Sequence, residues 1–281
     1  MSESDLHQFN VVTLNAFGVP TIRTRARLRT IARELNDRAL NAVCLQEVQL
    51  QRYVPVLSGA FSNFPYASWE PHLYAPKGGL MTLTREPQSS GRFIPFRNRG
   101  WLFGPIIADR MLHKGMLVCR LEHRGLPITL INTHLAANYS GNWERSNRYA
   151  KLEALQLAQL AEVVNEQPPE SLIVVVGDFN IPRYSWLYEE FLTATRLHDP
   201  LGEVHDPTYR PHALLPAQVA SMLNIAIDHA LIRVPEGLAA RYESVIILRD
   251  KVELVDGSHA HLSDHYGIHL RIEWPKAVVS D

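Results

Sequence analysis

Short apolar runs of strand length dominate the chain. Most are rich in Val, Ile and Leu and are bounded by Gly, Pro, Asn or Asp, which is typical of strands in a largely buried sheet. The predicted strands are residues 9–15, 40–46, 78–84, 91–96, 115–121, 127–134, 172–178, 225–232, 243–249 and 266–274.

Three helical segments lie between these runs. Residues 24–37 place apolar side chains on one face and arginines on the other, and residues 143–167 are rich in good helix formers and stop before Pro168. Residues 185–195 form the third predicted helix. Strands and a helix come early and again late, with no linker between, so we predict two helix-covered sheets packed face to face in a single domain, 1–281. A two-domain division is the weaker alternative.

Composition narrows the class of protein. The chain is 46% hydrophobic and 20% charged, with a formal charge of -1, so the overall positive charge of a strong nucleic-acid binder is missing. The net charge does not exclude a local basic patch on the surface. Cys44 and Cys119 lie inside apolar runs and are predicted as core residues rather than a disulfide. No secretory signal is visible, and the apolar stretch 213–232 is too polar to cross a bilayer, so we expect a soluble, cytoplasmic protein.

Polar residues gather where the predicted strands end or begin, which is where rigid scaffolds present functional groups. Each of them alone is commonly a turn residue, a surface acid or a satisfied histidine. Together they supply a hard-cation site, histidines and an amide. The set is Asn15, Gln46, Glu47, Thr133, His134, Asp178, Asn180, Asp228, His229, Ser263, Asp264 and His265.

This set suits metal-assisted attack on a phosphate. Carboxylate oxygens from Glu47, helped by the Asn15 amide and Asp264, make a hard, water-retaining site of the kind that Mg²⁺ prefers. Mn²⁺ is a possible substitute. We therefore predict these three residues as the metal site.

The remaining residues can act on water and on the phosphoryl group. His265 can take a proton from water if Asp228 holds its imidazole, and Asp178 can orient or deprotonate the nucleophile. Asn180 and His134 can donate hydrogen bonds to charge on the phosphoryl oxygens. Side chains alternate along an extended chain, so residues 178 and 180 are expected to face one phosphorus atom.

The motifs "LNAF", "LQEV", "NTHL", "GDFN", "IDHALI" and "LSDHYGI", in that order, resemble the endonuclease/exonuclease/phosphatase superfamily, which includes DNase I-like nucleases and neutral sphingomyelinases. The resemblance implies an α/β fold, a four-layer α/β/β/α sandwich of two mostly antiparallel sheets flanked by helices, and magnesium-dependent cleavage of a phosphoester. It implies Glu47 as the main metal ligand with Asn15 beside it. It leaves open whether Asp178 or His265 is the base.

One position departs from the pattern of many relatives. His229 stands where they carry Tyr after the aspartate, and no basic residue precedes Asp228 nearby. This departure puts the role of Asp228 in question.

A basic segment offers the best candidate for gripping substrate, because aromatic residues interleave with it. Such mixing suits either stacked bases or a lipid headgroup. The basic residues are Arg92, Arg97, Arg99, Arg110 and Lys114, and the aromatic ones are Phe93, Phe96, Trp101 and Phe103. Residues 212–223, Tyr139 and Trp143 are candidate apolar contacts near the site.

The segments "KGGLMTLTR", "HKGMLVCRLE" and "INTHLAANYSGNW" resemble neutral sphingomyelinases more than abasic-site endonucleases. The leading hypothesis is therefore a magnesium-dependent phosphodiesterase acting on a phospholipid headgroup, for which a transient contact with a membrane surface is possible. A nuclease is the alternative enzyme, with nucleic acid a less favoured partner. A catalytically silent phosphate-binding module is the alternative of another class, but it would not need a general base.

Overall fold

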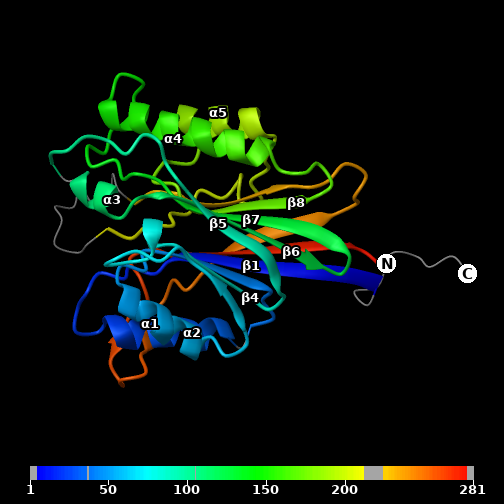
Figure 1. Cartoon of the computed structure of the whole chain (residues 1–281), viewed down its shortest axis with the longest axis horizontal. Helices are drawn as coiled ribbons and strands as arrows, with labels where there is room; N and C mark the ends of the chain where they lie inside the picture. Colours follow the sequence, from blue (N-terminus) through cyan, green and yellow to red (C-terminus); the bar gives the residue numbers. More distant parts are fainter. Residues whose placement is uncertain (1–4, 37, 105, 212–223, 277–281) are drawn as a thin grey trace, which may run out of the picture.

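Two β-sheets lie face to face in a computed structural model that describes residues 5–36, 38–104, 106–211 and 224–276 (Figure 1). In the first sheet the spatial order is β10 (Arg241–Ile247), β13 (Gly267–Pro275), β1 (Leu6–Asn15), β2 (Ala42–Gln46), β4 (Met81–Thr84) and β3 (Tyr66–Ser68). In the second it is β5 (Gln88–Pro95), β6 (Gly115–His123), β7 (Leu126–His134), β8 (Leu172–Asp178) and β9 (Asp228–Arg233). Each predicted strand is present.

Helices cover the outer faces of both sheets, which confirms the four-layer α/β/β/α sandwich (Figure 1). The first sheet is covered by α1 (Thr24–Asn36) and α2 (Val54–Ala60), and the second by α4 (Arg148–Asn165) and α5 (Trp186–Thr195). The short helix α3 (Ile107–Met111) lies at one end of the sandwich. Short elements complete the fold: the 3₁₀ turns η2 (Gln51–Tyr53) and η3 (Lys77–Gly79), and the hairpin of β11 (Val252–Glu253) with β12 (His259–Ala260).

Apolar side chains fill the three spaces between the four layers. Phe9 and Val174 belong to the cluster between the sheets, where Cys44 and Cys119 are buried as free thiols, as predicted. Burial raises the pKa of the Cys119 thiol to about 11, so this thiol stays protonated at neutral pH. No helix among the described residues is long and apolar enough to span a bilayer.

Each of the two large sheets contains one parallel pair of strands, and all other strand pairings among the described residues are antiparallel. The parallel pairs are β1 with β2 and β7 with β8, and the crossovers run through α1 and α4. In a parallel pair the carboxyl ends of both strands meet at the same edge. The register pairs Asn15 with Gln46 and His134 with Asp178, so the polar residues that end these strands come together.

The predicted helices are present, with one difference in length. The long helix α4 begins at Arg148 rather than at residue 143, because the Asn147 side chain caps it by accepting a hydrogen bond from the Tyr149 backbone N–H at 2.8 Å. The residues before Asn147 form turns, and they place Trp143 at the wall of a cavity described below.

Candidate active site

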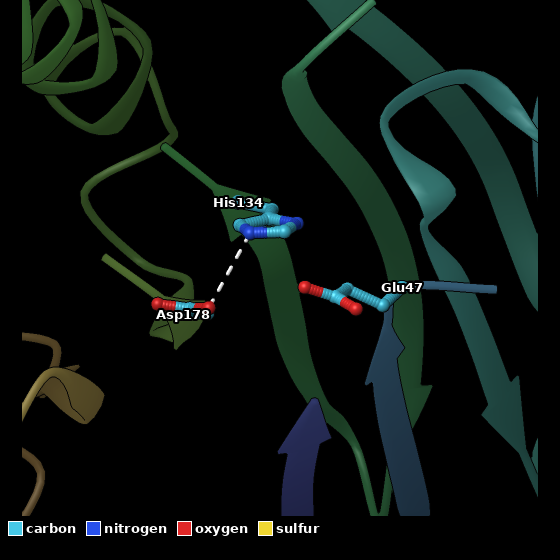
Figure 2. Close-up of side chains that lie close together, drawn as sticks. All are labelled: Glu47, His134 and Asp178. Atoms are coloured by element: carbon cyan, nitrogen blue, oxygen red, sulfur yellow. Dashed lines mark ion pairs between the residues drawn. The ribbon is translucent and has the colours of Figure 1, made fainter. Parts of the chain in front are cut away.

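The polar strand ends surround a cavity of about 590 Å³ at one end of the sandwich. This volume suits a small-molecule site. The cavity is lined by six of the eight residues that the sequence singled out for catalysis or metal binding: Glu47, His134, Asp178, Asn180, Asp264 and His265. The other two, Asn15 and Asp228, are buried in direct contact with lining residues. In Figure 2 the side chains of Glu47, His134 and Asp178 converge on one space.

Asp178 ends β8 and lies at the centre of the polar network. Its Oδ2 accepts a hydrogen bond from Asn15 Nδ2 at 2.9 Å and lies 3.3 Å from His134 Nε2 and 3.8 Å from His265 Nε2. Burial raises the pKa of the Asp178 carboxyl, but the two histidines more than offset burial and hold that pKa well below its ordinary value. Asp178 is therefore ionised at neutral pH.

His265 is held between two carboxylates. Its Nδ1 donates a hydrogen bond to Asp228 Oδ2 at 2.9 Å, which fixes the ring so that Nε2 faces Asp178. Burial lowers the pKa of His265, but Asp228 and Asp178 outweigh burial and raise that pKa to about 10. The Tyr209 ring covers His265 at a centroid distance of 4.9 Å. His265 thus carries a proton at neutral pH when only these protein charges act on it.

The departure at His229 does not disturb Asp228. The two residues are neighbours on β9, so their side chains point to opposite faces of the sheet. His229 is fully buried on the rear face, where its Nε2 donates to the Ile181 carbonyl at 3.1 Å and its ring meets Phe179 edge to face. Asp228 faces His265 and the cavity wall.

Asn180 lines the cavity, but the geometric reason predicted for this was wrong. The strand ends at Asp178, and Asn180 has a left-handed backbone with φ of 54°, so simple alternation does not apply. Its backbone N–H donates to Asp178 Oδ1 at 3.0 Å, and its Nδ2 donates to the Leu135 carbonyl at 3.1 Å. An Asx-type turn therefore places Asn180 beside Asp178.

Gly177 allows the two strands to approach closely just before this turn. It has φ of 144°, and a Cβ built there would lie 1.9 Å from the Thr133 carbonyl oxygen. A side chain at this position would push β8 away from β7, and with it Asp178 from His134. The glycine in "GDFN" is thus required by the packing that forms the site.

Glu47 follows β2 with a left-handed backbone, φ 54°, which turns its side chain into the cavity. A Cβ on Gly18 would lie 2.0 Å from the Glu47 carbonyl oxygen, so glycine is needed there for the loop to close over Glu47. Gln49 Nε2 donates to Glu47 Oε2 at 2.9 Å.

The donor set fits a divalent cation. Ligand atoms of Glu47, His134 and Asp178 all lie within 4.8 Å of one another. Asp264 lines the same cavity, and burial together with the nearby Glu47 raises the pKa of its carboxyl. Several carboxylates that repel one another across a small cavity are the arrangement that a hard cation such as Mg²⁺ relieves.

Asn15 occupies a supporting position in this arrangement. It is fully buried, its Nδ2 donates to Asp178, and its Oδ1 accepts from the Phe17 backbone N–H at 3.0 Å. These contacts orient Asp178. Its predicted role as a metal ligand stays a prediction.

A comparison with protein-family models decides the family. Residues 12–265 match the model of the Endonuclease/Exonuclease/phosphatase family. The chain belongs to this family. The cavity that holds Asp178, His134 and His265 is its candidate active site.

One curated relative in this family, from Drosophila melanogaster, is named "Putative neutral sphingomyelinase". It is 24% identical over 275 residues, which cover 95% of this chain and 61% of the relative. The chain thus spans less than two thirds of that protein's length.

Solved structures share the fold at low sequence identity. Sphingomyelinase C from Streptomyces griseocarneus superposes with a TM-score of 0.71 at 18% identity, over 96% of this chain and 100% of that one. A Staphylococcus aureus beta toxin variant with bound magnesium ions gives 0.73 at 16% identity, with the same two coverages. D. rerio TDP2 complexed with a single-strand DNA product gives 0.73 at 16%, over 94% and 98%. The fold alone therefore does not separate a lipid from a nucleic-acid substrate.

The sequence did not predict the role of two residues at the cavity, Lys114 and Asp109. Lys114 is buried, and its Nζ contacts His134 Nε2 at 2.8 Å, the Leu135 carbonyl at 2.7 Å and Asp109 Oδ1 at 2.9 Å. The sequence grouped Lys114 with surface arginines and passed over Asp109. A lysine directly before the buried strand β6 is the signal that could have set it apart.

The rest of the predicted substrate-gripping segment does not line the cavity, and Phe96 is fully buried between the second sheet and its helices. Arg97 forms an ion pair with Glu162 on α4 at 2.9 Å, and Arg99 contacts His113. Tyr139 and Trp143 line the cavity, as the sequence suggested. Residues 212–223, the other predicted apolar contact, lie outside the described residues.

Proposed function

We propose that this protein is a divalent-metal-dependent phosphodiesterase that cleaves a phospholipid headgroup phosphodiester, with water as the nucleophile. Mg²⁺ is the proposed ion, and Mn²⁺ a substitute. The observation that carries the proposal is the convergence of the anionic Asp178, two histidines and the Glu47 carboxylate on one cavity.

Glu47 and Asp264 would hold the ion, which when bound would withdraw electrons from a phosphoryl oxygen and neutralise its developing charge. Asp178 faces the same space and can hold a water molecule by accepting its hydrogen bond. Asn180 and His134 line the same cavity. The Asn180 amide can donate to a phosphoryl oxygen, whereas His134 can do so only through Nδ1, because Lys114 donates to its Nε2 at 2.8 Å.

The charges of the two base candidates favour Asp178 as the group that accepts the proton of water. Asp178 is ionised at neutral pH, whereas Asp228 and Asp178 together keep a proton on His265. A protonated His265 donates a hydrogen bond to the phosphoryl group instead, and Asp228 keeps its ring in place.

A phospholipid substrate is supported by the curated relative with a sphingomyelinase name and by the apolar part of the cavity wall. Tyr139, Trp143, Ile225 and Ile227 contribute to that wall. The chain's net charge of -1 gives little attraction for a long polyanion. The TDP2 structure with single-strand DNA product keeps a nuclease as the second candidate.

A substrate panel tests the proposal. Sphingomyelin, phosphatidylcholine, inositol phosphates, plasmid DNA and single-stranded DNA would be assayed with EDTA, Mg²⁺ or Mn²⁺. We expect metal-dependent release of phosphocholine, and a reduction of at least about 100-fold in Glu47→Gln, since that variant removes the main proposed ligand. A matched control is Glu162→Gln, an exposed acid on α4.

Two results would contradict the proposal. Faster cleavage of DNA than of any choline phospholipid would favour the nuclease. No hydrolysis of any of these substrates, nor of bis(p-nitrophenyl) phosphate, with either metal would favour a silent phosphate-binding module.

A further inference from the structure

Six large apolar side chains protrude into solvent from two segments near the cavity. They are Leu73, Tyr74, Leu102, Phe103, Ile107 and Met111, here called the apolar rim. Phe103 is 81% exposed, Leu73 76% and Met111 66%. A group of protruding apolar side chains of this size commonly marks an interaction surface rather than ordinary surface composition.

The helix α3 joins the apolar rim directly to the active site. Asp109 points inward, where it lines the cavity, pairs with Lys114 and accepts a hydrogen bond from the Ala137 backbone N–H at 2.9 Å. Ile107 and Met111, four residues apart on the same helix, are exposed instead. One short helix therefore has an inner side in the cavity wall and an outer side in solvent.

The segment that carries Leu73 and Tyr74 packs against the chain just after α3. The His72 and His113 rings lie 4.7 Å apart, and the Gly78 backbone N–H donates to the Leu112 carbonyl at 2.6 Å. Both segments of the apolar rim thus belong to one face at the cavity end of the sandwich. Figure 1 shows α3 at the end opposite the N- and C-terminal ends of the chain.

Basic residues accompany the apolar rim. Residues 97–114 contain four basic residues and one acidic residue, a net charge of +3 in a chain whose total is -1. The single acid, Asp109, is buried and paired with Lys114, and Arg97 is paired with Glu162 on α4, so the positive charge beside the apolar rim comes from Arg99 and Arg110. Arg99 and Arg110 remain partly exposed beside the apolar side chains. Apolar side chains flanked by positive charge complement a lipid surface, where acyl chains lie beneath a layer of phosphates.

The shape and chemistry of the apolar rim favour a lipid surface over a nucleic acid. Leu73, Leu102, Ile107 and Met111 are not aromatic and offer no ring for base stacking. The side chains protrude rather than line a groove, as is typical of groups that insert into the headgroup layer.

We propose that the apolar rim inserts into the surface of a phospholipid bilayer and brings the cavity against the headgroups. This inference rests on the proposed function, because it supplies the route by which a membrane-embedded substrate reaches the active site. Soluble phosphodiesters need no such route. The apolar rim therefore affects hydrolysis of vesicle lipids and not of soluble substrates.

The test uses the double variant Leu73→Ser/Met111→Ser, which removes one exposed side chain from each segment. Val245→Ser, on the edge strand β10, is the matched control because Val245 is also exposed and does not line the cavity. Binding is measured in EDTA by sedimentation with sphingomyelin and phosphatidylcholine vesicles, with and without phosphatidylserine. Hydrolysis is measured with Mg²⁺ on the same vesicles and on bis(p-nitrophenyl) phosphate.

We expect the double variant to bind vesicles at least about tenfold more weakly, since each large apolar side chain buried in lipid contributes a factor of this order. Its hydrolysis of vesicle lipid should fall in parallel, while bis(p-nitrophenyl) phosphate is cleaved at the wild-type rate. Val245→Ser should match the wild type throughout.

Two results would overturn the docking proposal: no binding of the wild type to any vesicle, or unchanged vesicle binding in the double variant. The proposed function fails separately. Vesicle binding that depends on the apolar rim, without hydrolysis of any phosphodiester, would support docking and remove the enzymatic proposal. Lipid hydrolysis at an equal rate in the double variant and the wild type would support the enzymatic proposal and remove the docking proposal.

Discussion

Two buried aspartate–histidine pairs lie on opposite sides of β9. They differ in the other charged groups that contact each pair. In the front pair, His265 Nδ1 lies 2.9 Å from Asp228, and the same ring faces Asp178 at the cavity. In the rear pair, His229 Nδ1 lies 3.9 Å from Asp199, which also accepts hydrogen bonds from Arg183 Nε and from Tyr188, each at 2.9 Å.

An arginine fixes the charge state of the rear pair. Burial raises the pKa of the Asp199 carboxyl, but His229 and Arg183 outweigh burial and lower that pKa to about 2. Because a guanidinium group keeps its charge throughout the pH range in which proteins are folded, Asp199 has a permanent cationic partner and remains an anion that holds the fold together. Within the described part of the chain, histidine is the only cation that bonds to the front carboxylate, so the charge of the front pair can change with pH and with ligands. The comparison indicates that the front pair serves chemistry and the rear pair serves packing.

The largest effect is expected at the carboxylate that the front histidine faces. Asp178→Asn should lower turnover by about 1,000-fold or more, because it removes the anion between His134 and His265 and keeps the shape of the side chain. Turnover would be measured on the best substrate of the panel, with far-UV circular dichroism and the melting temperature as checks of folding. A well-folded variant with near wild-type turnover would contradict the role assigned to Asp178.

Asp228→Asn should have a smaller effect, a loss on the order of 100-fold in turnover. Asp228 contributes most to the raised pKa of His265, so its neutralisation lets that pKa fall, and His265 loses its proton at lower pH than in the wild type. The basic limb of the pH–rate profile should therefore move to lower pH. An unmoved profile would show that His265 does not act through its proton.

Sequence reasoning identified the strands, the layers and the residues that meet at the cavity, because strand ends with unusual polar residues are visible in the pattern and the motifs keep their order. Its geometric account failed at Asn180, since alternation holds only on an extended backbone and a left-handed turn leaves no periodic signal. It also missed Asp109, because a helix as short as α3 is too brief to show a 3.6-residue period. The paired state of Lys114 depends on contacts with residues that are distant in sequence.

Arg183→Met tests the rear pair and should reduce stability rather than activity. Removing the arginine leaves Asp199 buried without its permanent partner, which we expect to cost about 3 to 5 kcal/mol of unfolding free energy. Turnover per folded molecule should stay within about twofold. Urea unfolding together with active-site titration would separate the two quantities.

The loss of unfolding free energy in Arg183→Met should be smaller at low pH than at neutral pH. The folded-state pKa of Asp199 lies below its ordinary value of 3.8, so the stabilisation is present above pH 3.8 and is lost as pH falls through about 2. The difference between Arg183→Met and wild type should therefore shrink below pH 4. A difference that stays constant down to pH 2 would exclude the ion pair as its source.

A third buried acid extends the comparison, because no histidine or arginine among the described residues bonds to it. Glu153 on α4 is almost fully buried, its Oε2 accepts a long hydrogen bond from Asn138 Nδ2 at 3.4 Å, and its Oε1 has no hydrogen-bond partner among the described residues. Burial raises the pKa of this carboxyl to about 9, with Asn138, Trp143 and Lys114 opposing the shift only in part. Glu153 is therefore neutral at pH 7, in contrast to Asp178 and Asp199.

Glu153→Gln should have the opposite sign, a gain in stability that grows with pH. In the wild type, unfolding releases a proton from Glu153 at any pH between 4.5 and about 9, so stability falls as pH rises through that window and is level above it. Glutamine has no proton to release. The melting temperature of the variant should therefore exceed that of the wild type by about 10 °C or more at pH 9 and by much less at pH 5. The control Glu162→Gln, on the exposed side of the same helix, should show no such trend. If the melting temperatures of Glu153→Gln and the wild type differ by the same amount at pH 5 and pH 9, Glu153 is ionised in the folded protein.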